Sequence, residues 1–166
     1  MQFLNCTLVG NNGSTSLIRN RSTVGVPFHI FTNNIFTSNS FTTELINYNA
    51  SWQTSGTITI LTNLFDGAVT APLQVNGSPV IGVSGNIAGN PDFFDLLGGD
   101  YRITTSSIAI DAGSSLNDVV EDFSGGPRPI GAFYDIGAFE GFSTSTLPMA
   151  TFNFSTEAKN WNFYLE

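Results

Sequence analysis

Charge is scarce in this sequence, and positive charge is the scarcest part of it. Charged residues make up 11% of the 166 residues, against about 25% in a typical globular domain. Five Lys and Arg residues stand against thirteen Asp and Glu residues, which gives a formal net charge of −8. Binding to nucleic acid and attraction to an anionic membrane both need clustered basic side chains. The sequence therefore predicts no nucleic-acid partner.

Cysteine and long apolar runs are also nearly lacking. Cys6 is the single cysteine, which excludes an intrachain disulfide framework and a cysteine-based zinc site. We interpret it as a small hydrophobic residue in or beside the core. No run reaches the roughly 20 apolar residues of a membrane span, and residues 1–10 lack the basic start and apolar centre of a signal peptide. We expect no membrane span, and we expect the sequence to begin within a repeat of a longer protein.

A repeat of 28 to 29 residues runs through the first half of the chain. Residues 3–8 align with residues 31–36 and 60–65, and apolar residues recur in register at two positions: Phe3, Phe31 and Ile60 at one, and Leu8, Phe36 and Phe65 at the other. Leu17-Ile18 aligns with Leu45-Ile46, and Gly85-Asn86-Ile87 repeats the pattern after a shorter interval. One such repeat is too short to bury its apolar residues alone, so stacking of repeats is expected.

This register predicts an all-β fold of stacked coils. Each repeat would supply two or three short strands that pair in parallel with the next coil, about 4.8 Å away, with Phe and Ile inside and Asn at the turns. The alternative is a β-sandwich, which also has short strands and turn signals. The nearly constant offset favours the stacked coils. The abundance of Asn, Ser, Thr and Gly is typical of extracellular proteins of this kind and predicts an extracellular or cell-surface location.

The second half is acidic and contains five ordered motifs. Residues 86–141 hold nine acidic residues against Arg102 and Arg128, a net charge of −7. The motifs are Gly85-Asn86-Ile87 with Pro91-Asp92-Phe93, Asp100-Tyr101-Arg102-Ile103, Ser107-Ile108-Ala109-Ile110-Asp111-Ala112-Gly113, Asp122-Phe123-Ser124-Gly125-Gly126-Pro127-Arg128-Pro129, and Asp135-Ile136-Gly137-Ala138-Phe139-Glu140. This succession resembles the closing segment of bacterial secreted right-handed parallel β-helix proteins with variable C-terminal anchors. The resemblance is close over residues 85–141 and looser over residues 1–141.

The resemblance implies a right-handed parallel β-helix, a solenoid, with coils in residues 1–85 and a C-terminal capping module in residues 86–141. The sequence departs from the family pattern at Asn90, Ile103 and Ile108, where Asp, Leu and Pro are usual. The module is expected to cover the open end of the last coil, with residues 108–110 as a final strand. Arg128 is one of only two cations in the module. We expect it to pair with at least one of three carboxylates, those of Asp111, Asp135 and Glu140.

Calcium is the alternative role for the acids of this module. Asp118, Glu121 and Asp122 are close in sequence, and Ca²⁺ prefers oxygen ligands, but their spacing matches no EF-hand. No other cofactor is expected. No catalytic cluster emerges, because Glu44 and Asp66 fall at different phases of the repeat and His29 stands alone beside a Phe-rich strand.

Residues 142–166 begin with a Ser/Thr linker, residues 143–146, and continue with alternating aromatic residues. This tail resembles the start of the C-terminal sorting domain used in type IX secretion. A β-hairpin packed on the β-helix is the alternative interpretation.

Two functions remain open at this point. One is a non-catalytic, monomeric surface or adhesive β-helix segment that contacts polysaccharide or cell-surface glycan through exposed Asn, Thr and aromatic residues. The other is the C-terminal end of a polysaccharide lyase or glycoside hydrolase whose catalytic coils precede Met1, since β-helices host both kinds of protein.

Overall fold

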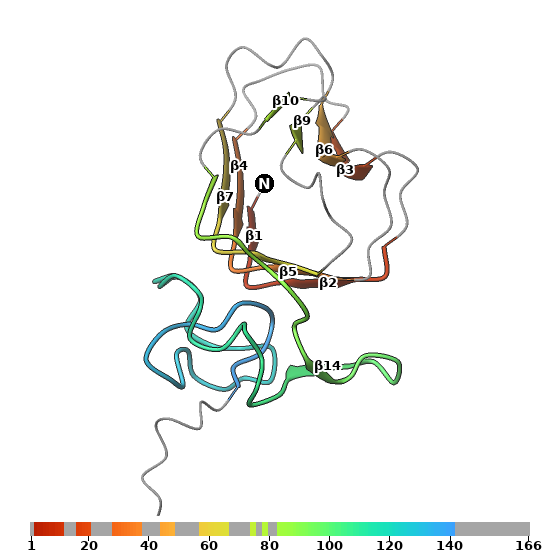
Figure 1. The fold of residues 1–166 in the computed structure, drawn as a ribbon. Coiled ribbons are helices and arrows are strands. Elements are labelled where there is room, and N and C mark those ends of the chain that lie inside the picture. Colours follow the sequence, from red (N-terminus) through yellow and green to blue (C-terminus); the bar gives the residue numbers. More distant parts are fainter. Residues whose placement is uncertain are drawn as a thin grey trace, which may run out of the picture.

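The computed structural model describes residues 2–11, 16–20, 28–37, 44–48, 57–66, 74–75, 78–79 and 83–141. In these residues the chain forms short β-strands and turns, and no helix (Figure 1). The fold is all-β, as the sequence predicts. The tail, residues 142–166, for which a linker and a sorting domain or hairpin are predicted, lies outside the described residues.

Three four-stranded sheets surround a shared interior (Figure 1). The first sheet is parallel and contains β1 (Gln2–Leu4), β4 (Phe28–Thr32), β7 (Thr57–Leu61) and β11 (Val83–Ser84). The second is parallel and contains β2 (Thr7–Val9), β5 (Ile35–Thr37), β8 (Leu64–Phe65) and β12 (Ile87–Ala88). The third contains β3 (Ser16–Asn20), β6 (Glu44–Tyr48) and β9 (Gln74–Val75) in parallel, with β10 (Ser78–Pro79) antiparallel to β9.

The strand pairing follows the sequence repeat. Phe3 pairs with Phe31 and Phe31 with Ile60 in the first sheet, so the predicted offsets of 28 and 29 are confirmed. We refer to the four successive stretches as rows 1 to 4: residues 2–20, 28–48, 57–75 and 83–88. Neighbouring rows pair in parallel, unlike the antiparallel neighbours of the sandwich that the sequence left as an alternative.

The bend between the first and second strand of each row is built from the same two positions. The first position has positive φ in every row, at Asn5 (47°), Asn33 (56°), Thr62 (49°) and Gly85 (65°). The second is occupied by Asn34, Asn63 and Asn86 in rows 2 to 4, which we call the asparagine ladder. Each ladder side chain accepts a hydrogen bond from the backbone N–H of the preceding row, at 2.9, 2.9 and 2.8 Å. The backbone N–H groups at these turns thus bond from one row to the next along the stack.

Thr62 does not suit the conformation that it adopts. A β-branched residue rarely takes a left-handed backbone conformation, whereas Asn and Gly tolerate it. We expect Thr62→Asn to raise the free energy of unfolding by about 1 kcal/mol. The new amide would replace the Thr62 hydroxyl, which donates to Asn33 Oδ1 at 2.6 Å. Urea unfolding followed by circular dichroism measures the change, with the exposed Thr105→Asn as the matched control. An unchanged or lower stability of Thr62→Asn contradicts the prediction.

The second sheet is apolar on both of its faces. On the inner face Phe36 and Phe65 stack with their ring centroids 5.0 Å apart, and Phe3 and Phe31 of the first sheet stack likewise at 5.2 Å. On the outer face the fully buried Ile35 and Leu64 pack against residues 103, 109 and 136 of the acidic module, residues 86–141. Parallel sheets are commonly covered on both faces, and here the module supplies the second cover.

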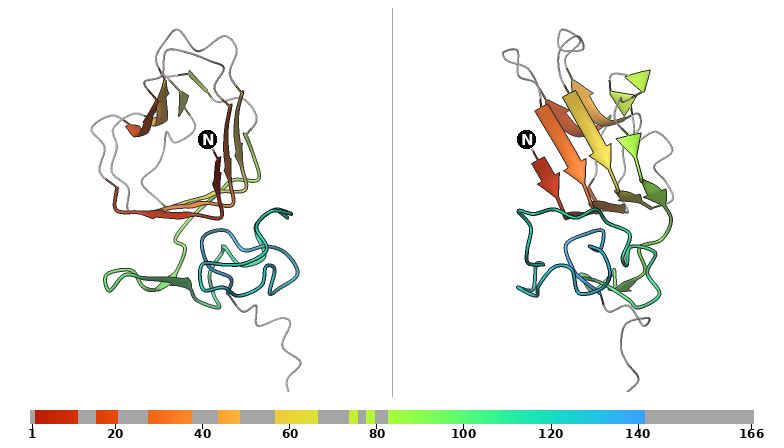
Figure 2. Two further views of the ribbon diagram at one scale, coloured as in Figure 1. Left: turned by 180° about the vertical axis from the view of Figure 1, so that it is seen from behind. Right: turned by 90° about the vertical axis from the view of Figure 1, so that its left-hand side faces the viewer.

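The acidic module lies along the side of the rows, and the expectation that it covers the end of the last coil is wrong. Figures 1 and 2 show it against the outer face of the second sheet. The reason is the apolar outer face at Ile35 and Leu64, which would otherwise meet water. Its first residues also complete row 4 through β12.

The predicted strand at residues 108–110 does not form either. These residues make a turn, because Ser107 bonds locally: its carbonyl accepts from Ile110 N–H at 3.3 Å and its hydroxyl oxygen from Ala109 N–H at 3.1 Å. The strands of the module are instead β13 (Phe93–Asp95) and β14 (Asp100–Ile103), an antiparallel hairpin.

Candidate functional site

A buried ion pair lies at the centre of the acidic module. Arg128 Nη1 is 2.6 Å from Glu140 Oε1, and the two side chains are 1% and 0% exposed. Arg128 also donates to the carbonyls of Asp135 at 3.3 Å and Gly137 at 2.8 Å. This is the contact expected for Arg128 from the sequence, and Glu140 is the partner among the three candidates.

The other two candidates bond to the backbone. Asp135 accepts from the N–H groups of Asp111 at 2.7 Å and Gly141 at 2.5 Å. Asp111 accepts from Phe133 N–H at 2.9 Å. Glu140 likewise accepts from Ile130 and Asp135 N–H, both at 3.0 Å. These carboxylates therefore hold the loops of residues 111–141 together, because loops without strands must satisfy their backbone groups through side chains.

The same segment is bonded to rows 1 and 2. The Asn5 side chain donates to the Asp135 carbonyl at 3.0 Å, and the Thr7 hydroxyl oxygen accepts from Ala138 N–H at 3.0 Å. In row 2 the Asn33 carbonyl accepts from Gly137 N–H at 2.8 Å, and its side chain exchanges two hydrogen bonds with the Ser114 backbone. The ion pair thus positions the backbone that attaches the module to the rows.

Burial makes Asp135 sensitive to pH. The side chain is almost fully buried, and this raises its pKa from 3.8 to about 6, although the N–H groups of Asp111 and Gly141 oppose the shift. The folded protein then binds this proton more tightly than the unfolded chain does. The carboxyl therefore favours the fold at low pH, and its contribution is lost as the pH rises from about 4 to about 6.

We expect this contribution to disappear in Asp135→Asn. Urea midpoints measured across that pH range should fall with rising pH more steeply in the wild type than in Asp135→Asn. Asp118→Asn, which changes an exposed acid of the same module, should keep the wild-type slope. Equal slopes in the wild type and Asp135→Asn would contradict the assignment.

The three calcium candidates are not brought together as a metal site. Asp118 and Glu121 are exposed, and Asp122 accepts from three backbone N–H groups, those of Ser124 and Gly126 at 2.8 Å and Glu140 at 3.1 Å. Within the described residues, no group of three or more His, Cys, Asp or Glu side chains is placed to hold a metal ion. Asp118, Glu121 and Asp122 are close in sequence because they belong to a tight loop, and in that loop the Asp122 carboxylate accepts hydrogen bonds from backbone N–H groups.

The remaining sequence candidates lie in different strands and turns of the rows. His29 is buried in β4, and burial lowers its pKa. Asp66 accepts from the Thr37 hydroxyl at 2.6 Å, and Glu44 lies in β6 of the third sheet. Cys6 is half-buried, its thiol donates to the Leu4 carbonyl at 3.3 Å, and burial raises its pKa.

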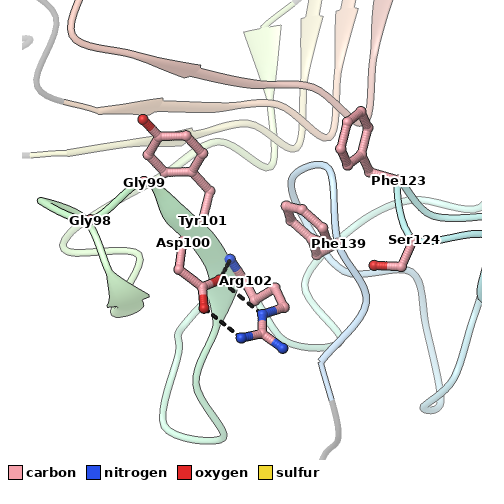
Figure 3. A pocket seen from close by; sticks show the side chains of 8 residues that line it. All are labelled: Gly98, Gly99, Asp100, Tyr101, Arg102, Phe123, Ser124 and Phe139. Atoms are coloured by element: carbon pink, nitrogen blue, oxygen red, sulfur yellow. Dashed lines mark hydrogen bonds and ion pairs between the residues drawn. The ribbon is translucent and has the colours of Figure 1, made fainter.

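An open groove in the module joins two segments that are distant in sequence. It has a volume of about 480 Å³. The hairpin end and β14 form one side, and the loops around residues 123 and 139 form the other (Figure 3). It is lined by Gly98, Gly99, Asp100, Tyr101, Arg102, Phe123, Ser124 and Phe139. Aromatic rings thus face a groove that also carries charged and hydroxyl groups.

Asp100 and Arg102, two of the residues that line this groove, neutralise each other. Arg102 donates from Nε to Asp100 Oδ1 at 2.8 Å and from Nη2 to Oδ2 at 2.5 Å. The hydrogen bond that the Arg102 side chain donates lowers the pKa of Asp100 to about 2. The same hydrogen bond raises the pKa of Arg102. The guanidinium also lies 5.3 Å above the Phe94 ring. Its planar fork is therefore held in one orientation.

The sequence does not predict the groove. One signal was available, since Asp100 and Arg102 are two residues apart in a strand and so share a face. The opposite side, at Phe123 and Phe139, follows no repeat and is placed only by the loop contacts described above.

No protein-family model matches the chain, and no curated protein matches it. The described residues contain no helix that is long and apolar enough to cross a membrane.

Proposed function

We propose that the chain is a segment of a secreted or cell-surface right-handed parallel β-helix with a non-catalytic, adhesive role exerted through glycan contact. The observation that carries this proposal is the open groove, where the exposed Phe123 ring and the half-buried Tyr101 and Phe139 rings lie beside the Asp100–Arg102 pair. Exposed aromatic and polar groups side by side are typical of binding surfaces.

The parallel rows support the β-helix part of the proposal. Three sheets repeat at offsets of 28 to 29 residues between rows 1 and 3, and ring stacks and asparagine bonds run from row to row. Each row contributes one strand to each of the first two sheets, as one coil of a β-helix would.

The bonding of the clustered acids supports a non-catalytic role. Asp111, Asp122, Asp135 and Glu140 all accept hydrogen bonds from backbone N–H groups. A carboxylate that serves as a general base or nucleophile needs an oxygen directed at substrate. These four are engaged in holding loops.

Affinity electrophoresis of the full chain tests the proposal. Gels containing soluble neutral polysaccharides (xyloglucan, galactomannan) or uronates (alginate, polygalacturonate) are compared with a gel that contains none. Retardation in at least one polysaccharide is expected, without release of reducing ends or of unsaturated uronates. Unretarded migration in every gel contradicts the glycan role, and turnover of any polysaccharide contradicts the non-catalytic role.

A further inference from the structure

We propose that the groove between β14 and the loops of residues 123 and 139 is a binding site for an uncharged pyranose oligosaccharide. This inference rests on the proposed glycan role and adds to it the location of the site and the class of sugar.

The aromatic rings of the groove are held in place by other rings. Phe123 and Phe139 meet edge to face, with centroids 5.5 Å apart, and Tyr101 meets Phe93 in the same way at 5.7 Å. Phe123 is nevertheless 82% exposed. A large ring that stays exposed and fixed offers an apolar face, and the C–H face of a pyranose ring is a matching apolar surface. Figure 3 shows Tyr101 on one side of the groove and the two Phe rings on the other.

The polar groups of the groove suit hydroxyl ligands. A sugar hydroxyl both donates and accepts, and neighbouring hydroxyls on one ring need donors and acceptors close together. The Asp100–Arg102 pair presents a carboxylate and a guanidinium side by side, and the Ser124 hydroxyl lies on the opposite side of the groove.

Charge selects against acidic sugars. Arg102 is the only cationic side chain of the groove lining and is already paired with Asp100, and the surrounding module carries a net charge of −7. A uronate or sulfated glycan would bring further negative charge without an unpaired cation to meet it. The neutral polysaccharides are therefore the ligands that this groove fits.

The loop side of the groove is fixed before any ligand binds. Phe123 N–H donates to the Ala138 carbonyl at 2.8 Å, and Asp122 bonds to the N–H groups of Ser124 and Glu140. Asp122 thereby ties together the loop segments that carry Phe123 and Phe139. A site that is already ordered loses less conformational freedom on binding.

Isothermal titration calorimetry on the full chain tests the inference. The probes are cellohexaose, laminarihexaose and mannohexaose, with a polygalacturonate hexamer as the charged comparison. We expect binding of at least one neutral hexamer, a loss of affinity of tenfold or more in Phe123→Ala, and no binding of the uronate. Phe133→Ala is the matched control, since Phe133 is 58% exposed and outside the groove. It should bind as the wild type does.

The outcomes separate this inference from the proposed function. If a polysaccharide retards Phe123→Ala and Asp100→Ala as strongly as the wild type, the glycan site lies elsewhere. That result would overturn the groove as the binding site, while the adhesive role would stand. Stronger binding of the uronate than of the neutral hexamers would overturn the selectivity. Absence of binding to every hexamer in titration and to every polysaccharide in gels would overturn both. Circular dichroism of each variant establishes that it is folded.

Discussion

Glu140→Ala is expected to lower the free energy of unfolding by about 3–5 kcal/mol, the range for removing one partner of a buried ion pair. The guanidinium of Arg128 would stay buried without its carboxylate. The N–H groups of Ile130 and Asp135 would also lose their acceptor. Urea unfolding of the full chain, with the slope checked for constancy, measures the loss.

Glu121→Ala is the matched control for this change. It removes one negative charge from the same module, but the side chain is exposed, so we expect an effect within about 0.5 kcal/mol. In a double-mutant cycle with Arg128→Ala, the double variant should lose clearly less than the sum of the two single variants. Additive losses, or a small effect of Glu140→Ala, would contradict the role assigned to the pair.

Asn63→Ala is expected to lower the free energy of unfolding by about 4 kcal/mol, because several buried groups lose their partners at once. Asn63 is fully buried in the middle of the asparagine ladder. Its Oδ1 accepts from the backbone and side chain of Asn34, both at 2.9 Å. Its Nδ2 donates to the carbonyls of Phe31 and Leu61, both at 3.0 Å.

The ladder itself provides the comparison. Asn86 occupies the same position in row 4 but is half-buried, so Asn86→Ala should be less harmful than Asn63→Ala. Asn117→Ala changes an exposed residue and should have little effect. The three stabilities, measured by urea unfolding, should therefore rank in that order. An equal loss for Asn63 and Asn117 would show that the ladder does not contribute.

The stacking register could be read from the sequence, because apolar residues recur at a nearly constant offset. Pairing of Phe3 with Phe31, or of Leu8 with Phe36, follows directly from a constant offset. The partner of Arg128 could be narrowed to three acids for a different reason. With nine acids and only two cations in the module, a carboxylate partner for the Arg128 guanidinium is expected, but the choice of Glu140 depends on tertiary contacts.

The sequence contains a signal for the lateral position of the module, although its family-like motifs predict a cap at the end of the coils. Ile35-Phe36 and Leu64-Phe65 are adjacent apolar pairs, and adjacent residues of a strand point to opposite faces. Both faces of that sheet therefore had to be covered. At residues 108–110 the sequence predicts a strand and the structure has a turn, because a short apolar run does not distinguish a strand from a buried turn. The groove could not be derived, since its two sides meet only through tertiary contacts.

The attachment of the module to the side of the rows has a consequence for how this protein can change in length. The module bonds to Asn5 and Thr7 in row 1 and to Asn33 in row 2, and it packs on Leu64 in row 3. The module therefore fits only one number of stacked rows between its contacts. An extra repeat inserted between these rows would displace row 1 from its contacts by about 4.8 Å. Repeats gained or lost by duplication are thus compatible with this module only outside the rows that it spans.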